Sequence, residues 1–533
     1  MVYNIIVSMC ECCRQLKNEL AEERSRRNAI EQELSLAMQM IEMMKRKMFG
    51  RSSEQADPDQ GTFEGLLSDW DKLNGESAVP PTETEKIEYE RRRKTQNNNL
   101  NGRVKIPEHL ERVDKFIDIP DSEKICPVTG EALVCIGEDI TEQLACEPGR
   151  LYVIRYRRPK YVSPDRRKGN IVGVLTALLP ESPIERCKAD VSLITQIIIN
   201  KYCDHIPLTR QEGIFAREQI GIPVSTMADW CRESANVLKP LHQLLKDTVL
   251  SCDYINADDT RELFLQKNGE GAKKGRMWIY VANMMKLPDN KDGPIENIKL
   301  MFFDFSQDWN EEHPLKILKN YKGFFQSDAY PGFKNAAKLK DITAIGCWCH
   351  SRRKFLDALK AGVKDAKIFV TLINILYRIE HHIGELKKKN VQDDVLLALR
   401  KKRALRVFKK FFKKVNSTPA LPKSLLGKAL TYARNQEESL KRYVENLRFK
   451  PDNNVAENFI RPLCVGRNNY LFMGSEGGGR TAAILYSFIG SCRALGINPY
   501  EYLKDVLSRI NSLPHSRLHE LLPHNWQKLR QQK

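Results

Sequence analysis

The chain has 533 residues and a mass of 61.4 kDa, and its 86 Lys and Arg against 68 Asp and Glu give a formal net charge of +18. With 41% hydrophobic residues, this composition excludes wholesale disorder, collagen and a simple coiled-coil rod, and the length predicts about three or four folded units. No apolar run approaches the ~18 residues of a membrane span, the first residues lack the basic region of a signal peptide, and the 14 Cys are scattered. We therefore expect a multidomain cytoplasmic protein without a membrane segment.

The N-terminal part predicts a long helix followed by a linker. Residues 1–50 contain neither Gly nor Pro before Gly50, and apolar side chains recur at the spacing of a heptad seam, at Ile30, Leu34, Ala37, Ile41, Met44 and Met48. A coiled-coil dimer is favoured over a single amphipathic helix docked on the body, because the seam is narrow and its flanks are charged. Residues 51–104, with three Pro and a run of Asn, predict a linker.

The next two segments differ in their periodicity. Residues 105–175 contain short alternating apolar and polar stretches, which predict a small β-rich module. Residues 176–250 predict helices, and two of these, at 210–218 and 224–235, are joined by a short turn that contains Gly221. Two helices joined in this way match a helix-turn-helix motif, although an ordinary helical hairpin fits the sequence equally well.

The second helix of this pair would be the recognition helix. Ser225 is suited to cap its N-terminus, since a Ser hydroxyl accepts hydrogen bonds from the first backbone amides of a helix. The recognition-helix interpretation brings four side chains near DNA, those of Ser225, Thr226, Asp229 and Arg232.

From residue 251 the pattern becomes mixed α/β and then helical. Strand candidates occur at residues 277–282, 298–303, 323–326 and 343–347, and a helical stretch runs with breaks from His350 to about residue 448. This order predicts an α/β core that is followed by a helical block.

The helical block carries a concentrated positive charge. Residues 387–414 hold twelve Lys or Arg and two Asp, which is a net charge of +10 in one segment. A polyanionic partner is expected, and nucleic acid is the first candidate, with Lys409 and Lys410 among the contacts. A solvated helix face is the alternative, and three Phe among the lysines indicate that one side of the segment is packed.

Three acidic residues stand out by their context. Asp258 follows an apolar-flanked stretch, Asp328 comes after a strand candidate, and Glu457 lies at a helix start. Carboxylates from strand ends and a helix can converge on two Mg²⁺ or Mn²⁺ ions, which activate a water or a 3′-hydroxyl for phosphodiester displacement. Context alone does not select these three from 68 acids, because most such carboxylates are caps or turn residues.

Several motifs together resemble, in order, the motif set of the IS66 family of bacterial transposases. The strongest stretches are GCWCHSRRKF at residues 346–355 and ENFIRPLCVGRNN at residues 457–469. Residues 47–54 are similar to the end of the family's leucine-zipper segment. The other matching stretches are residues 254–260, 323–333, 471–475 and 477–479, so that the resemblance covers nearly the whole chain.

The resemblance implies a DDE transposase with an RNase H-like catalytic core over residues 251–475. Its metal-binding triad maps onto Asp258, Asp328 and Glu457, and residues from about 356 to 450 form a helical insertion in the core. Residues 476–533 are then a C-terminal helical segment. The resemblance and the local charge imply further DNA contacts from His350, Arg352, Arg353, Arg461, Arg467 and Arg480.

The chain departs from the family pattern at two places. The family has Asp-Glu-Thr at the first acid, where this chain has Asp258-Asp259-Thr260, so Asp259 is an alternative to Asp258. The family's zinc-finger module carries two Cys-x-x-Cys pairs. Here Thr129 occupies the second Cys position of the pair that begins at Cys126, and residues 162–165, where the second pair is expected, lack Cys. One thiolate of four cannot hold a tetrahedral zinc ion. We therefore expect the β-rich module to keep its shape without structural zinc.

Two functions from different classes compete. The leading one is an insertion-sequence transposase that binds terminal inverted repeats, cleaves the 3′ ends with metal ions and transfers them to target DNA. The alternative is a catalytically inactive or repurposed sequence-specific DNA-binding protein. Expected partners are double-stranded DNA, further copies of the chain through the coiled coil, and small accessory proteins of the same element, which the resemblance implies.

Overall fold

The computed structural model divides the chain into two compact units. The larger comprises residues 101–352, 372–412 and 433–533, and the smaller comprises residues 1–100, 353–371 and 413–432. The structure describes residues 106–531 except 107, 126–130, 148, 163–173, 181, 186, 267–270, 286–295 and 329–330, together with six helical residues between 19 and 30. The predicted linker and nearly all of the predicted coiled-coil seam therefore lie outside the described residues.

A small sheet forms where the sequence predicts a β-rich module. β2 (Val134–Glu147) and β3 (Arg150–Val162) make a long antiparallel hairpin, β1 (Arg112–Phe116) adds to β3 in parallel, and β4 (Leu175–Thr176) pairs with its end. Charged pairs cross the strands: Arg155 contacts Glu142 at 3.2 Å, and Arg157 contacts Glu138. These pairs explain how so polar a hairpin holds its register.

Three helices follow this sheet: α3 (Val191–Tyr202), α4 (Leu208–Arg217) and α5 (Val224–Leu250). The turn between α4 and α5 buries Ile220 and Ile222. The prediction that Ser225 caps the second helix is wrong, because α5 begins one residue earlier and has Pro223 at its N-cap without a side-chain hydrogen bond. The fixed backbone of Pro223 provides the extended conformation from which the helix starts.

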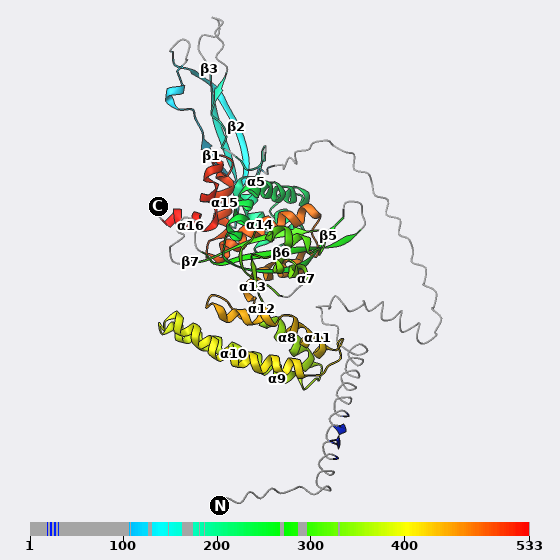
Figure 1. Ribbon diagram of the computed structural model, residues 1–533. Coiled ribbons are helices and arrows are strands. Elements are labelled where there is room, and N and C mark those ends of the chain that lie inside the picture. The colour runs from blue at the N-terminus through cyan, green and yellow to red at the C-terminus, as the bar shows by residue number, and fades with distance from the viewer. Residues whose placement is uncertain are drawn as a thin grey trace, which may run out of the picture. The chain divides into compact units, whose positions relative to one another are not determined.

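The core of the larger unit is a five-stranded sheet in the order β7-β6-β5-β8-β9. Figure 1 labels β7, β6 and β5 of this sheet. β5, β6 and β7 are antiparallel neighbours, whereas β8 and β9 run parallel to β5. The strands are β5 (Tyr254–Leu265), β6 (Ala272–Met285), β7 (Glu296–Ser306), β8 (Gly323–Gln326) and β9 (Ile342–Ile345). The four sequence-based strand candidates fall on β6, β7, β8 and β9, and β5 extends well beyond Asp258.

Helices that precede the five strands in the chain and helices that follow them pack on this sheet. α14 (Glu476–Ala494) packs along β7, where the Ser487 and Ser491 hydroxyls accept backbone N–H bonds from Phe303 and Met301. Gly479 permits the close approach, since a Cβ there would come within 2.7 Å of the Phe305 ring. α13 (Asn454–Tyr470) packs on β5, and α5 packs on β7. These three helices therefore pack on the antiparallel strands β5, β6 and β7.

The remaining helices are short connections, a helical block and a C-terminal segment. α6 (Glu312–Leu318) and α7 (Pro331–Lys334) lie between β7 and β9 in the chain, and α15 (Pro499–Arg509) and α16 (Pro523–Gln531) end it. The block between β9 and α13 consists of α8 (Trp348–Lys360), α9 (Ala366–Lys388), α10 (Asp393–Ser417), α11 (Leu425–Asn435) and α12 (Glu437–Lys441). No helix among the described residues is long and apolar enough to cross a lipid bilayer.

The basic helix α10 is anchored by one of its own charges. Arg400 is 1% exposed, contacts the Glu380 carboxylate and donates to the backbone carbonyl of Asn446 at 2.8 Å. The Trp348 indole stacks on the Phe408 ring with centroids 5.6 Å apart. Arg400 is therefore a core residue, while Lys409 and Lys410 lie on the exposed face.

Candidate active site

The parallel pairing of β5 with β8 brings two predicted acids to the same edge of the sheet. Asn256 on β5 is in register with Gln326 on β8, and Asp258 and Asp328 each follow two residues later. Parallel strands run in the same direction, so two residues that lie the same number of positions after a paired couple are again neighbours. The prediction that Asp258 lies at a strand end is wrong, since β5 continues to Leu265 and Asp258 projects from its middle.

The third acid is carried by α13, which is docked on β5 beside Asp258. Asn453, fully buried just before this helix, donates from its amide to the Ala257 carbonyl at 2.8 Å and accepts from the Asn256 amide at 3.0 Å. Glu457 lies in the first turn that follows, as predicted from the sequence. The three acids therefore sit on elements that are tied to one another next to the sheet edge.

A buried amide network joins these elements. The Gln326 side chain accepts a hydrogen bond from Asn256 at 3.1 Å and donates to the Gly346 carbonyl at 3.2 Å and the Lys450 carbonyl at 2.9 Å. Asn256, Gln326 and Asn453 are all fully buried, so each must be hydrogen-bonded to offset its desolvation. Sequence reasoning missed these residues, because their partners lie 70 and 197 residues away.

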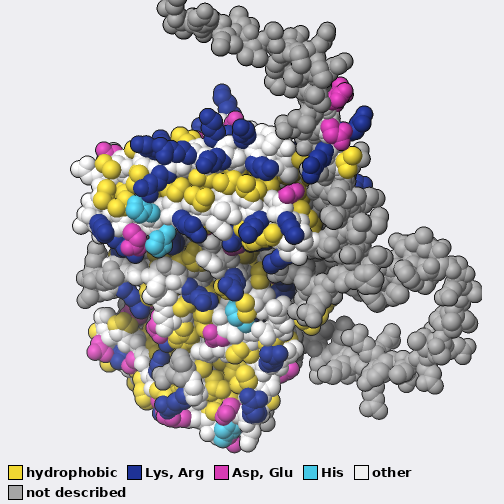
Figure 2. All heavy atoms as spheres, turned by 90° about the horizontal axis from the view of Figure 1, so that it is seen from below, with side chains coloured by type: hydrophobic (Ala, Val, Ile, Leu, Met, Phe, Trp, Pro, Cys, Tyr) yellow, Lys and Arg dark blue, Asp and Glu magenta, His cyan; other side chains and the backbone are white. Residues whose placement is uncertain are grey.

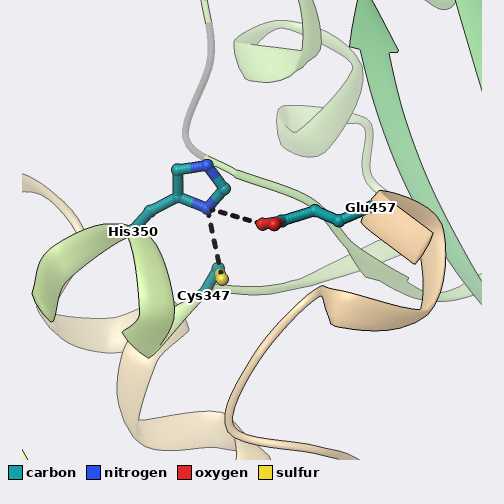
Figure 3. A group of neighbouring side chains, drawn as sticks. All are labelled: Cys347, His350 and Glu457. Carbon is teal, nitrogen blue, oxygen red and sulfur yellow. Dashed lines mark hydrogen bonds and ion pairs between the residues drawn. The ribbon is translucent and has the colours of Figure 1, made fainter. Parts of the chain in front are cut away.

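His350 lies near two of the acids, Asp328 and Glu457, and Figure 3 shows its ring beside Glu457 and Cys347. Its Nε2 is 3.9 Å from Asp328 Oδ2, its Nδ1 is 3.6 Å from Glu457 Oε1, and the same Nδ1 is 3.3 Å from Cys347 Sγ. α8 places the imidazole there from its first turn. His350 therefore lies close to two of the acids, while its DNA contact stays a prediction, and Cys347 was not singled out from the sequence.

The carboxylates repel one another. Burial raises the pKa of Asp258 well above its usual range, and the negative charges of Asp328, Asp259 and Glu457 raise it further. A divalent cation would relieve this repulsion, and oxygen donors of this kind suit Mg²⁺ and Mn²⁺. The oxygen donors of these residues are therefore of the kind that the predicted hard-metal site needs, and the site itself stays a prediction.

Asp259, the alternative first acid, points to the other face of β5. Its Oδ2 accepts from Arg276 at 3.0 Å and from the Trp309 indole at 3.1 Å, and the Arg276 guanidinium lies 3.6 Å from the centre of the Trp309 ring. Burial raises the pKa of Asp259 to about 7 although Arg276 lowers it. Asp259 is thereby engaged outside the group of three acids. Arg276 and Trp309 carry no motif that could have revealed them.

The predicted DNA contacts on α13 and α14 differ in their surroundings. Arg461 is exposed one helical turn beyond Glu457, so both face the same side of α13. Arg467 instead binds β5, with its guanidinium 3.1 Å from Thr260 Oγ1 and 3.6 Å from Glu262 Oε1. Arg480 is exposed and pairs with Glu476 within its own helix.

The other predicted contacts are spread over α5 and α8. Ser225 and Arg232 are exposed and Thr226 is half-buried, but Arg232 pairs with Asp229 at 2.9 Å and Glu233 at 3.1 Å. This face of α5 is therefore not a basic one. On α8, Arg352 donates to Asn374 at 2.8 Å, and Arg353, the next residue, is exposed and belongs to the smaller unit.

The described part of the β-rich module contains no group of converging metal ligands. Cys135 is exposed and Cys146 is buried in the core, while positions 126, 129 and 163–165 lie outside the described residues. The absence of structural zinc therefore stays a prediction.

Comparison with known proteins assigns the chain to a family. The family profile described as "Transposase IS66 family" matches residues 186–481, which is more than half of the chain. The profiles "IS66 C-terminal element", "zinc-finger binding domain of transposase IS66" and "Transposase C of IS166 homeodomain" match residues 487–524, 123–162 and 37–114. A zinc-finger profile thus matches the module in spite of its missing Cys.

Similar proteins occur in Sinorhizobium fredii (strain NBRC 101917 / NGR234). The uncharacterized protein y4qI is 30% identical over 429 residues, which cover 78% of this chain and 76% of the relative. The uncharacterized protein y4hP is 29% identical over 441 residues, which cover 79% of this chain and 76% of the relative. With the ordered motifs and the profile match over its central half, the chain belongs to the IS66 family of transposases.

Proposed function

We propose that this protein is the transposase of an insertion sequence and that Asp258, Asp328 and Glu457 form its DNA-cleaving centre. The observation that carries the proposal is the convergence of the three carboxylates, which the β5–β8 register and the docking of α13 bring about. The raised pKa of Asp258 supports it, because a carboxylate cluster that repels itself is suited to cations.

The sheet supports an RNase H-like core. Three antiparallel strands followed by two strands parallel to the first give the spatial order 3-2-1-4-5 in β5 to β9. In this arrangement the first and fourth strands are neighbours, so that an acid on the first and one after the fourth lie together. The helical block between β9 and α13 is then an insertion that separates the second acid from the third in the chain.

The side chains have separate tasks in the proposed reaction. Asp258, Asp328 and Glu457 would hold two Mg²⁺ or Mn²⁺ ions, which would supply activation of a water or a 3′-hydroxyl and stabilisation of the leaving oxygen. The Asn256–Gln326–Asn453 network keeps the elements that carry the acids together. His350 contacts Asp328 and Glu457 and orients both carboxylates. Arg461, exposed on the same side of α13 as Glu457, would bind a phosphate near the scissile bond.

Double-stranded DNA is the proposed partner. Within the larger unit α10 exposes Lys401, Lys402, Arg403, Arg406, Lys409 and Lys410. Figure 2 shows Lys and Arg side chains in rows on the face viewed from below, beside a band of hydrophobic side chains. Such rows favour contact with successive phosphates. Further copies of the chain and accessory proteins of the element complete the proposed assembly.

The test is cleavage of a labelled duplex that carries the element's end, with Mg²⁺ or Mn²⁺ and with the accessory proteins. Asp328→Asn keeps the size of the side chain and removes its charge, and we expect it to lower nicking by at least ~100-fold while DNA binding persists. Asp341→Asn is the matched control, since Asp341 is exposed and pairs with Lys322 at 3.3 Å.

Each outcome decides between the two functions. Metal-dependent nicking by the wild type and by Asp341→Asn, but not by Asp328→Asn, supports the catalytic centre. Equal nicking by all three proteins contradicts it. Binding without nicking by all three supports the alternative, a DNA-binding protein without catalytic activity.

A further inference from the structure

A second set of ligand atoms lies at the edge of the proposed centre, formed by Cys347, His350 and Glu457 (Figure 3). Each residue offers one donor atom, and the three atoms lie within 4.8 Å of one another. Among the residues that the structure describes, it is the one group of three that mixes sulfur, nitrogen and oxygen donors in this way. Such a mixture differs in kind from the all-carboxylate set of the cleaving centre.

The distances suit a tetrahedral ion. Zinc binds sulfur at about 2.3 Å, imidazole nitrogen at about 2.0–2.1 Å and carboxylate oxygen at about 2.0–2.2 Å, so tetrahedral neighbours are about 3.3–3.6 Å apart. The His350 Nδ1 atom is 3.3 Å from Cys347 Sγ and 3.6 Å from Glu457 Oε1. The sulfur and the carboxylate oxygen, which lie within 4.8 Å of each other, are the one pair that has to approach further.

The surroundings of Cys347 and His350 resemble those of metal ligands. The backbone N–H of Asn453 donates to Cys347 Sγ at 3.2 Å, which fixes the position of this sulfur beside His350 Nδ1. The second imidazole nitrogen, Nε2, faces Asp328 Oδ2 at 3.9 Å. A carboxylate behind the ring fixes which nitrogen is available to a metal, as in carboxylate–histidine–zinc arrangements.

We propose that Cys347, His350 and Glu457 bind a borderline divalent ion, with Zn²⁺ as the first candidate, and that this ion inhibits DNA cleavage. Sulfur and imidazole select Zn²⁺ over Mg²⁺. Glu457 belongs to both sets, so an ion held by Cys347 and His350 withdraws this carboxylate from the cleaving centre. The inhibition rests on the proposed function, whereas the binding of the ion does not.

The binding test compares Cys347→Ser with the wild-type full-length protein. Ser keeps a helix-capping oxygen at the start of α8 but lacks the soft sulfur donor. Cys349→Ser is the control, because Cys349 is two residues away and outside the group. Metal-free protein is titrated with Zn²⁺ against a chromophoric chelator and, separately, with Co²⁺, whose thiolate charge-transfer absorption reports sulfur ligation.

We expect Cys347→Ser to bind one equivalent of Zn²⁺ less than the wild type and to lose part of the Co²⁺ absorption, while Cys349→Ser behaves as the wild type. Zinc held by the β-rich module would appear equally in all three proteins and so does not obscure the difference. Equal stoichiometry and equal absorption in Cys347→Ser and the wild type would overturn the site. X-ray absorption of Co²⁺-loaded wild type, which needs no variant, should show sulfur together with nitrogen or oxygen ligands, and a shell of oxygen alone would also overturn it.

The inhibition test adds Zn²⁺ to Mg²⁺-supported cleavage and divides each rate by the zinc-free rate of the same protein. Half-inhibition of Cys347→Ser should require at least ~10-fold more Zn²⁺ than that of the wild type, the loss expected when one ligand is removed. Equal sensitivity contradicts the inhibitory role. If the wild type does not cleave, the proposed function fails, and the binding test still decides the metal site.

Discussion

Glu262 gives the sharpest prediction of the structure. It lies on β5, on the same face as Asp258, and is completely buried. Neither of its oxygens accepts a hydrogen bond from the described residues, and its Oε1 is 3.6 Å from the Arg467 guanidinium. Burial raises the pKa of Glu262 to about 7, although Arg467 and Arg261 lower it. Two buried phenols, Tyr470 and Tyr486, also face this carboxyl group.

The sign and size of the effect follow from the two pKa values. The pKa is about 4.5 in the unfolded chain and about 7 in the folded one, so the contribution to stability is complete below pH 4.5 and is lost as the pH rises to 7. At about 1.4 kcal/mol for each unit of pKa difference, the loss is about 3 kcal/mol at pH 8 and about 1 kcal/mol at pH 5. The Gln of Glu262→Gln does not ionise, so this variant should be more stable than the wild type by these amounts. The loss of the charged partner of Arg467 reduces the gain by up to ~1 kcal/mol.

Native-state hydrogen exchange of peptides from β5 measures the opening free energy of this part of the molecule, which global unfolding of a two-unit chain does not isolate. The gain of Glu262→Gln should grow by about 2 kcal/mol between pH 5 and pH 8, after correction for intrinsic exchange rates. Glu212→Gln, at an exposed position on α4, should show no such growth. A gain that does not change with pH, or a variant less stable than the wild type at pH 8, would refute the reasoning.

Three further predictions concern the frame of the site and the basic helix. Arg400→Met should destabilise the larger unit by about 3–5 kcal/mol, measured by urea unfolding, because it leaves the Glu380 carboxylate without its buried partner. Gly323→Ala should lower both stability and cleavage. Gly323 has φ +143°, and a Cβ there would lie 2.4 Å from the Asp253 carbonyl oxygen, so the substitution displaces β8. Thermal unfolding followed by circular dichroism measures the loss of stability, and nicking assays measure the loss of cleavage. Lys409→Ala combined with Lys410→Ala should leave stability within ~0.5 kcal/mol of the wild type and lower the slope of log K against log salt by about 2 in DNA-binding titrations.

The local pattern of the sequence was sufficient for most elements of the α/β core. Apolar runs such as residues 277–282 and 298–303, the second interrupted by Lys299, lie within β6 and β7, because strands buried on both faces are mostly apolar. The pattern failed for β5, which carries two adjacent pairs of charged residues, Asp258-Asp259 and Arg261-Glu262, in its middle. This region is a strand because it pairs with β6 residue by residue up to Leu265, which is a tertiary effect. The coiled coil and the linker remain predictions.

The three acids could be named only through the family resemblance, and their support could not be named at all. The side chains of Asn256, Gln326 and Asn453 are ordinary amides in the sequence, and only the fold makes them a network. In the same way, Arg400 is one of twelve basic residues in its segment, and its burial distinguishes it from the others. Residues 387–414 therefore present one positive charge fewer at the surface than their composition predicts, because Arg400 is buried.

The span between Asn256 and Asn453 has a consequence for synthesis of the protein. These two residues are hydrogen-bonded but 197 residues apart in the chain. At about 5–20 residues per second, a ribosome takes about 10–40 s to reach the second after the first. Once residue 328 has been made, the nascent chain has β5 and β8 but lacks α13, and with it Glu457. A gene interrupted between codons 328 and 453 therefore yields a product that has α3 to α5 and two of the three acids, but not the third.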